Sequence, residues 1–259
     1  MDAVTVIGGG GGAGATTVVA ELALALAALG RRVAAVDADL GIGDLDARLG
    51  IVATPSLADV IAGHCTLADA LRMTTDGLRA VAAGGFAEPA RALSPHECLR
   101  LIEEFDATGQ RIDVLLLDAG TGVDPNTLFF AGVAQRIVLV TTPAVEAHHK
   151  AVAVLSAISS KLPKASVHVL VNRSRTASDG QQAFAALACS SEPTLCVDLH
   201  YLGAFPFDGR TDEAPGRDIP RGHGRMPAVR HAAEATAVRL LRASAGAPQL
   251  TGGPCLLAR

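Results

Sequence analysis

The feature that most constrains this chain is a cluster of six glycines within residues 8–17, GGGGGAGATT. The cluster follows an apolar stretch, 4–7, and precedes a stretch rich in alanine and leucine, 18–29. Because glycine has no Cβ, its backbone N–H groups can close around an anion, and the first turn of a following helix adds further free N–H groups. The segment therefore predicts a strand, a phosphate-binding loop and a helix in succession.

One phosphate-binding pattern, G-x-x-x-x-G-K-[ST], is matched by Gly9, Gly14 and Thr16. In that pattern the backbone holds phosphates, the lysine reaches the terminal phosphates, and the hydroxyl binds Mg²⁺. Ala15 stands where the pattern has its lysine. The loop thus matches this pattern at every defined position except that of the lysine.

A second pattern, G-x-G-x-x-G, is matched in full by Gly9, Gly11 and Gly14 and is typical of dinucleotide-binding folds. Asp37 ends the next apolar stretch, where such folds place an acid that binds a ribose. A glycine cluster satisfies several patterns by chance, so the loop by itself leaves both interpretations open.

Several carboxylates follow the apolar stretch 33–36. Asp37 and Asp39 come directly after it, and Asp44 and Asp46 lie a few residues further on. The carboxyl ends of parallel strands meet at one edge of a sheet, so we expect Asp37 and Asp39 to face the crevice beside the glycine loop. For Asp44 and Asp46 a solvated turn with a helix cap is the better interpretation.

A further acid, Asp118, ends the apolar stretch 112–117. An acid at this place, far along the chain from a glycine loop, is what a Walker B magnesium site needs. Mg²⁺ prefers hard oxygen ligands and keeps several waters. The sequence therefore predicts that Thr16 binds the metal and that Asp39 and Asp118 hold its waters.

Apolar and amphipathic stretches alternate along the chain, which predicts an α/β fold with a doubly wound, mostly parallel sheet and helices on both faces. The expected strands are 4–7, 33–36, 78–81, 112–117, 137–140, 167–171 and 201–205. The expected helices are 18–29, two within 56–71 capped by Ser56 and Thr66, 94–105, one from 124, 144–162, one including 184–187, and 227–243. On helix 94–105 we expect Leu99, Leu101, Ile102 and Phe105 to face the core. We assign 1–245 to one domain and 246–259 to a loose tail.

Composition limits the class of partner and the compartment. The formal net charge is -4 and the only lysines are Lys150, Lys161 and Lys164, so we do not expect a nucleic-acid partner. The five cysteines are scattered without a C-x-x-C pair, which indicates reduced thiols rather than a zinc site or a disulfide framework. No secretion signal and no apolar run of about 18 residues is present, so we expect a cytoplasmic protein.

Seven segments, taken in order, resemble a known family. They are the loop 8–17, DADLGIGDLDARLG (37–50), TPSLADVIAGHCTLADAL (54–71), LLLDAGTGV (115–123), VLVTTP (138–143), LVNR (170–173) and YLGAFPFD (201–208). The chain resembles the MinD/ParA family of deviant P-loop ATPases over nearly its whole length. Within that family it is most similar to the flagellar-number regulators of the FlhG, FleN or YlxH type.

The resemblance implies a P-loop NTPase-like fold and a site for ATP and Mg²⁺. It implies that Asp39 orients the attacking water, that Asp118 is the Walker B acid, and that Thr16, Asp39 and Asp118 serve the metal. The nucleotide-binding residues that it implies are Gly10, Gly11, Gly12, Ala13, Gly14, Ala15, Thr16, Thr17, Asn172, Arg173 and Pro206. Of these, Asn172 and the segment around Pro206 would lie on the adenine.

The chain departs from the family loop, K-G-G-V-G-K-T-T, at both lysines. Gly10 and Ala15 stand at those two positions. In the family one lysine lies along the β- and γ-phosphates and the other reaches the phosphates of a dimer partner. Losing a cationic clamp can cost on the order of 10³–10⁵ in the rate of phosphoryl transfer. We therefore expect a protein that binds ATP and whose hydrolysis is weak or lost.

The resemblance also implies partners. It implies a nucleotide-dependent homodimer and contacts with an FlhF-like GTPase, flagellar switch proteins or a transcriptional regulator. The function expected is a regulatory switch that controls flagellar number or placement. The alternatives are an active ATPase of the same family, of the ParA, MinD or cellulose-synthesis type, and a dinucleotide-binding oxidoreductase.

Family members bind a membrane through a C-terminal amphipathic helix. Here the helix 227–243 is rich in alanine and lacks Phe, Trp and Lys. We expect it to pack against the domain through Val229, Ala233, Thr236 and Leu240. Any contact with the inner face of the cell membrane would then be peripheral.

Overall fold

One eight-stranded sheet, in the order β3-β4-β2-β5-β1-β6-β7-β8, forms the centre of the computed structural model. The structure describes residues 1–259 apart from 41–42, 85–92, 192–194, 208–225 and 244–259. Neighbouring strands are parallel except β3 and β4, which are antiparallel. The strands are β1 (Asp2–Gly8), β2 (Val33–Asp37), β3 (Arg72–Met73), β4 (Arg79–Val81), β5 (Val114–Thr121), β6 (Arg136–Thr141), β7 (Ala165–Ser174) and β8 (Val197–Pro206). The mostly parallel α/β sheet predicted from the alternating pattern is confirmed.

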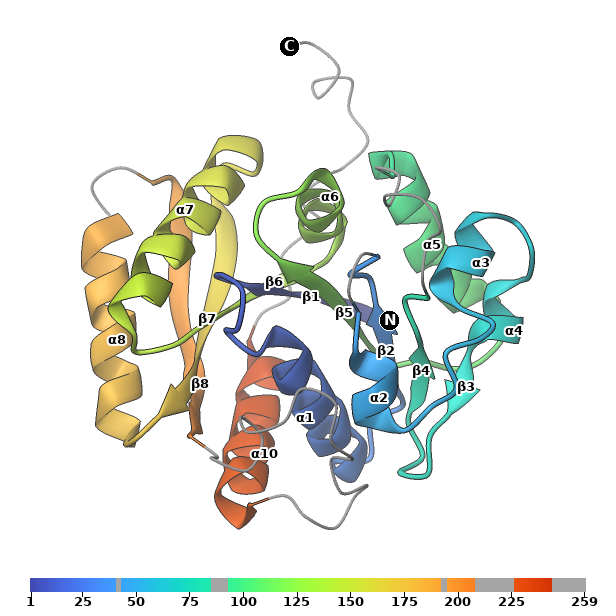
Figure 1. Ribbon diagram of the computed structural model, residues 1–259, viewed down its shortest axis with the longest axis horizontal. Helices are drawn as coiled ribbons and strands as arrows, with labels where there is room; N and C mark the ends of the chain where they lie inside the picture. The colour runs from blue at the N-terminus through green and yellow to red at the C-terminus, as the bar shows by residue number, and fades with distance from the viewer. Residues whose placement is uncertain (41–42, 85–92, 192–194, 208–225, 244–259) are drawn as a thin grey trace.

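Helices cover both faces of the sheet (Figure 1). One face is covered by α1 (Ala15–Ala28), α2 (Leu45–Leu49) and α10 (Pro227–Arg242). The other face is covered by α3 (Leu57–Ile61), α4 (Leu67–Ala70), α5 (Pro95–Ala107), α6 (Pro125–Val133), α7 (Val145–Lys161) and α8 (Ala177–Ser191). The result is a three-layer arrangement with an apolar core on each side of the sheet.

Alternate residues of one strand supply the two cores. In β2, Val33 and Ala35 pack with α1, whereas Ala34 and Val36 pack with the helices on the opposite face. Successive side chains of a strand point to opposite faces, and a parallel sheet is covered on both. This is why the central strands appear in the sequence as continuous apolar runs.

The strand register places the ends of three central strands side by side. Asp118 in β5 is the partner of Val6 in β1 on one side and of Asp37 in β2 on the other. Gly8, which ends β1, is the register partner of Thr121 in β5, so the loop begins beside the end of β5 and one strand away from the end of β2. The carboxyl edge of the sheet is where ligands bind in doubly wound folds.

The two short helices predicted within 56–71 are present with their caps. The hydroxyls of Ser56 and Thr66 accept the N–H groups of Asp59 and Asp69, and those two carboxylates accept the backbone N–H groups of the capping residues. Both are complete capping boxes. They fix the start of α3 and of α4.

Some boundaries differ from the predictions. α1 begins at Ala15 rather than Val18, because the end of the loop already forms the first helical turn. β5 begins after Ile112 and continues past Asp118. In α5, Cys98 is buried and Leu99 only partly buried. β3 and α2 are additional to the predicted elements; with two and five residues they are too short for a periodic pattern.

The last helix packs as predicted. Val229, Ala233, Thr236 and Leu240 of α10 are buried, and the helix lies against α1 (Figure 1). Among the described residues, no helix is long and apolar enough to cross a membrane. The predicted tail, 246–259, lies outside the described residues.

His168 gives the fold a measurable dependence on pH. It lies in β7 with its ring centroid 5.3 Å from that of His200, and burial, with His200 and Arg136 nearby, lowers the pKa of His168 to about 4. A histidine in the unfolded chain has a pKa of about 6.5. Between these values the unfolded state binds a proton that the folded state does not, so the free energy of unfolding falls as the pH falls through this range.

We expect His168→Gln to reduce this loss of stability between pH 6.5 and pH 4. Urea unfolding measured at several pH values in that range tests the expectation. His149→Gln, a change at an exposed position of α7, is the control and should leave the pH dependence as in the wild type. An unchanged pH dependence in His168→Gln would contradict the assignment.

Candidate functional site

The glycine loop runs from the end of β1 at Gly8 to the start of α1 at Ala15. Gly12 and Gly14 have φ values of 81° and 83°, in the left-handed region that glycine adopts readily. Among the described residues, a Cβ at Gly11 or Gly12 would have no heavy atom within 4 Å apart from its chain neighbours, so these residues leave the outer side of the loop open. Within the described part of the chain, no side chain caps α1 at Gly14. The loop and the free N–H groups of the first helical turn form a cradle into which a phosphate fits.

Asn172, at the carboxyl end of β7, holds the loop in place. Its Nδ2 donates to the carbonyl of Ala13 at 2.9 Å, and its Oδ1 accepts the N–H of Arg173 at 2.9 Å. A Cβ at Gly14 would lie 2.5 Å from the same Nδ2, so the amide packs directly on the loop backbone. The structure thus joins Asn172 to the loop, and its contact with an adenine stays a prediction.

Arg173 and Pro206 lie at the same edge of the sheet, further from β1. Arg173 is exposed and has a φ of 57°, which is uncommon for a residue other than glycine. Pro206 ends β8 opposite Ser174 of β7. With β6 between β1 and β7, these residues flank the loop on one side only.

Asp118 is fully buried behind the loop. Its Oδ1 accepts the N–H of Gly120 at 3.3 Å, whereas its Oδ2 has no hydrogen-bond partner among the described residues. Burial raises the pKa of Asp118 to about 6, although the nearby side chain of Thr16 and the N–H of Gly120 favour the charged form. A buried carboxylate oxygen without a partner is rare in proteins. A water bound to Mg²⁺ is a group that would satisfy it, so this carboxylate fits a place beside a hydrated metal.

Asp39 reaches the same turn from the segment after β2. A Cβ at Gly120 would lie 2.5 Å from the Oδ2 of Asp39, and Gly120 has a φ of 71°, so both the space and the backbone favour glycine there. The side chain of Thr16, in the first turn of α1, lies near the carboxylate of Asp118. The structure therefore brings together Thr16, Asp39 and Asp118, the three residues predicted to serve a metal.

Asp37 has a different surrounding from the one predicted. It is fully buried, and its two oxygens accept the N–H groups of Asp39 at 3.2 Å and Leu45 at 3.1 Å. Burial, with a further contribution from the charge of Asp118, raises the pKa of Asp37 to about 8. Asp37 thus shapes the turn that presents Asp39 instead of facing the crevice itself.

These observations count against a dinucleotide site. The carboxylate that would bind a ribose, that of Asp37, is buried and occupied by backbone N–H groups. In dinucleotide-binding folds the first strand lies next to the second, in the order 3-2-1-4-5-6. Here β5 lies between β1 and β2 and brings its acid beside the loop. The order of the strands therefore favours the phosphate loop with a Walker B acid.

One residue beside the loop is missing from the predictions. A Cβ at Gly10 would lie 2.5 Å from the Cδ of Lys150, a residue of α7. The only signal in the sequence is that a lysine-poor chain places one of its three lysines in the helix after 137–140, the strand that turns out to be the neighbour of β1. The contact itself is visible only in the folded chain.

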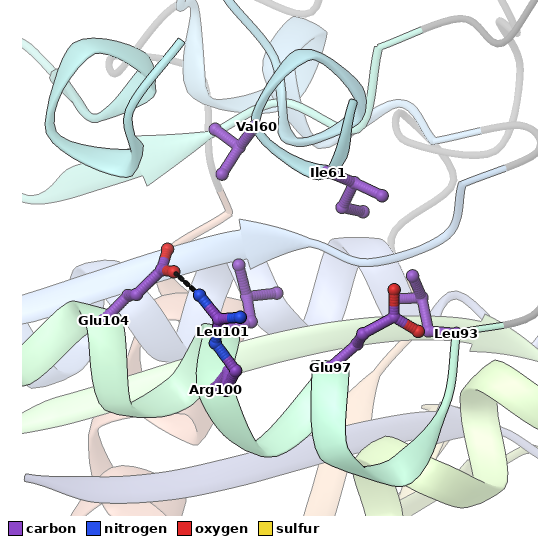
Figure 2. A pocket seen from close by; sticks show the side chains of 7 residues that line it. All are labelled: Val60, Ile61, Leu93, Glu97, Arg100, Leu101 and Glu104. Atoms are coloured by element: carbon purple, nitrogen blue, oxygen red, sulfur yellow. Dashed lines mark ion pairs between the residues drawn. The ribbon is translucent and has the colours of Figure 1, made fainter. Parts of the chain in front are cut away.

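A pocket between α3 and α5 lies apart from these residues. Figure 2 shows Val60 and Ile61 of α3 facing Arg100, Leu101 and Glu104 of α5. Its charged groups are engaged, because Arg100 and Glu104 form an ion pair of 3.6 Å and Glu97 belongs to the capping box at Ser94. We interpret this pocket as a gap between packed helices.

Comparison with curated proteins identifies relatives. The chain is 35% identical to the antiactivator FleN of Pseudomonas aeruginosa over 208 residues, which cover 80% of this chain and 74% of FleN. It is 26% identical to the flagellum site-determining protein YlxH of Helicobacter pylori, over 72% of this chain and 63% of YlxH. It is 28% identical to the septum site-determining protein MinD of Bacillus subtilis, over 67% of this chain and 65% of MinD. The chain thus spans just under two thirds of these last two proteins.

Solved structures share the fold. The cell division protein MinD of Aquifex aeolicus is 24% identical with a TM-score of 0.73, over 94% of this chain and 98% of that one. MinD of Pyrococcus horikoshii in complex with Mg-ADP is 23% identical with a TM-score of 0.63, over 96% of this chain and 92% of that one. The predicted P-loop NTPase-like fold is confirmed. Residues 4–220 match the CobQ/CobB/MinD/ParA nucleotide binding domain, and by this match and its similarity to FleN the chain belongs to that family of nucleotide-binding proteins.

Proposed function

We propose that this protein is a nucleotide-dependent switch that binds ATP with Mg²⁺ and acts through contacts with other proteins. The observation that supports this most directly is the convergence of an open phosphate loop with Thr16, Asp39 and Asp118 at one edge of the sheet. The unpaired, buried Oδ2 of Asp118 adds a reason for a hydrated cation at that place. The MinD relative that binds Mg-ADP shares this fold.

Each residue would have a separate task. The backbone N–H groups of residues 10–17 would hold the phosphates, with the positive end of α1 adding to the attraction. The hydroxyl of Thr16 would bind the metal, and Asp118 would accept hydrogen bonds from its waters. Asp39 would orient a water near the terminal phosphate. The metal, when bound, would neutralise phosphate charge and shield it from the acids.

We propose further that hydrolysis is slow or absent. The loop carries no charged side chain between Gly8 and Thr17, and Ala15 and Gly10 replace the two family lysines. Phosphoryl transfer depends on positioned positive charge, and its loss is expected to lower the rate on the order of 10³–10⁵. Nucleotide binding needs less positive charge from side chains than phosphoryl transfer does, because backbone amides and Mg²⁺ hold the phosphates in the ground state.

The relatives suggest where the switch acts. The similarity to FleN and YlxH supports a role in controlling flagellar number or placement. Partners would then be an FlhF-like GTPase, flagellar switch proteins or a transcriptional regulator, and the ATP-bound form would be a homodimer. MinD of Aquifex aeolicus, which shares the fold, forms a complex with the protein MinC.

An active ATPase is the second candidate. Thr16, Asp39 and Asp118 are all present and close together, which supports a place for a metal and its waters that does not depend on the loop lysines. Activity would then require a cation from elsewhere in the fold. The rate of phosphate release separates the two candidates.

We expect Mg-ATP to bind and to protect the protein from thermal unfolding, and NAD to do neither. Asp118→Asn should weaken Mg-ATP binding by about 10-fold to 100-fold, a loss typical when a group that orients metal ligands is removed. Isothermal titration calorimetry measures the affinities, and thermal melts with and without nucleotide measure the protection. Asp106→Asn, the same change at an exposed position of α5 outside the site, is the control. Protection by NAD without protection by ATP would contradict the proposal.

We expect phosphate release with Mg-ATP to remain near the rate without protein. Asp39→Ala should then show the same low rate, because there is little turnover for Asp39 to support. A colorimetric phosphate assay on both proteins provides the measurement. Clear turnover in the wild type that Asp39→Ala abolishes would favour the active ATPase instead.

A further inference from the structure

The phosphate loop rests directly on α7 at two consecutive positions. A Cβ at Gly9 would lie 3.1 Å from the Cβ of Ala151. A Cβ at Gly10 would lie 2.5 Å from the Cδ, 3.0 Å from the Cβ and 3.3 Å from the Cγ of Lys150. The stem of Lys150 therefore lies along the backbone of the loop, in the space that a side chain at position 10 would take.

This contact explains why glycine stands at position 10. A side chain there would have to displace the stem of Lys150, because real Cβ atoms do not approach other atoms so closely. Gly10 has no positive φ that would require glycine for its backbone conformation. The absence of a side chain at Gly10 leaves space beside the loop, and the side chain of Lys150 occupies this space.

The charge of Lys150 belongs to a side chain that runs beside the loop. Its side chain is exposed, so the ammonium group is not sealed in the core. The ammonium nitrogen is two bonds beyond Cδ, the atom that comes nearest to position 10. The loop between Gly8 and Thr17 has no cation, and the other two lysines of the chain lie at the far end of α7 and beyond it.

We propose that Lys150 is a cation of this site that binds the phosphates in the ground state, supplied by α7 in place of the loop lysine missing at position 10, while no cation among the described residues replaces the one missing at position 15. Its ammonium group would contact the polyphosphate of the nucleotide held by the loop, with Gly10 as the residue that makes room for it. This inference rests on the proposed binding of Mg-ATP. It adds a residue that neither loop pattern contains.

The test compares two lysines of one helix. Lys150→Gln should weaken binding of Mg-AMPPNP by about 10-fold to 100-fold, the range expected for losing a hydrogen bond to a charged group. Lys161→Gln, the same change at an exposed position of α7, should leave the affinity unchanged. The loss should be smaller for AMP, which has one phosphate, than for AMPPNP. Equal melting temperatures of the variants without nucleotide show that the fold is intact.

A second pair of variants tests whether the two positions are equivalent. Lys150→Ala removes the Cγ and Cδ beside Gly10 and leaves only the Cβ, 3.0 Å from a Cβ at position 10, so Gly10→Lys in that background needs a shift of a few tenths of an ångström. The double variant should regain most of the affinity that Lys150→Ala loses. If the double variant binds Mg-AMPPNP no more tightly than Lys150→Ala, the proposal that a lysine at position 150 replaces one at position 10 is overturned.

The outcomes separate this inference from the function on which it rests. If the wild type binds Mg-AMPPNP and Lys150→Gln binds it equally well, Lys150 is not the cation and the nucleotide switch stands. An equal loss in Lys161→Gln would also overturn the assignment, because it would reveal a general effect of charge. If the wild type does not bind the nucleotide, both proposals fall.

Discussion

Two buried carboxylates on neighbouring strands impose the main constraint on this structure. Asp37 and Asp118 are register partners at the ends of β2 and β5, and both are fully buried. The charge of Asp118 disfavours the charged form of Asp37, which adds to the effect of burial. Asp37 is satisfied by two backbone N–H groups, whereas one oxygen of Asp118 is unpaired. The unpaired Oδ2 of Asp118 therefore leaves a position at this edge of the sheet that a cation with its bound water would satisfy.

The division of labour between these two acids follows from their surroundings. By accepting from Asp39 and Leu45, the carboxylate of Asp37 folds the segment after β2 back toward the sheet. Asp39 then reaches Gly120, beside the turn that follows Asp118. Asp37 thus stabilises the turn, whereas Asp39 and Asp118 face the loop. Three similar residues acquire different roles because their hydrogen-bond partners differ.

The sequence predicts those parts of the site that depend on local patterns. A strand, a glycine loop and a helix are contiguous, and acids that end apolar strands can be placed at one sheet edge without knowing the strand order. The capping boxes at Ser56 and Thr66 are local as well. The role of Asp37, the bond from Asn172 to Ala13 and the contact of Lys150 with Gly10 depend on tertiary neighbours. The spacing of residues within one element carries no information about such contacts. In the sequence Gly10 is a missing lysine, whereas in the structure it leaves the space that the side chain of Lys150 occupies.

The charges at the loop also bear on how metal and nucleotide would bind in the proposed switch. A triphosphate placed at the loop would face Asp39 and Asp118 across a short distance, and like charges repel strongly where water is partly excluded. With the loop itself uncharged, Lys150 offers a single positive charge against several negative ones. On the proposed function, the double charge of Mg²⁺ would therefore be needed between phosphates and acids for the nucleotide to stay. On this argument metal and nucleotide bind as one unit, and a site with fewer lysines depends more strongly on its metal than a site that keeps both.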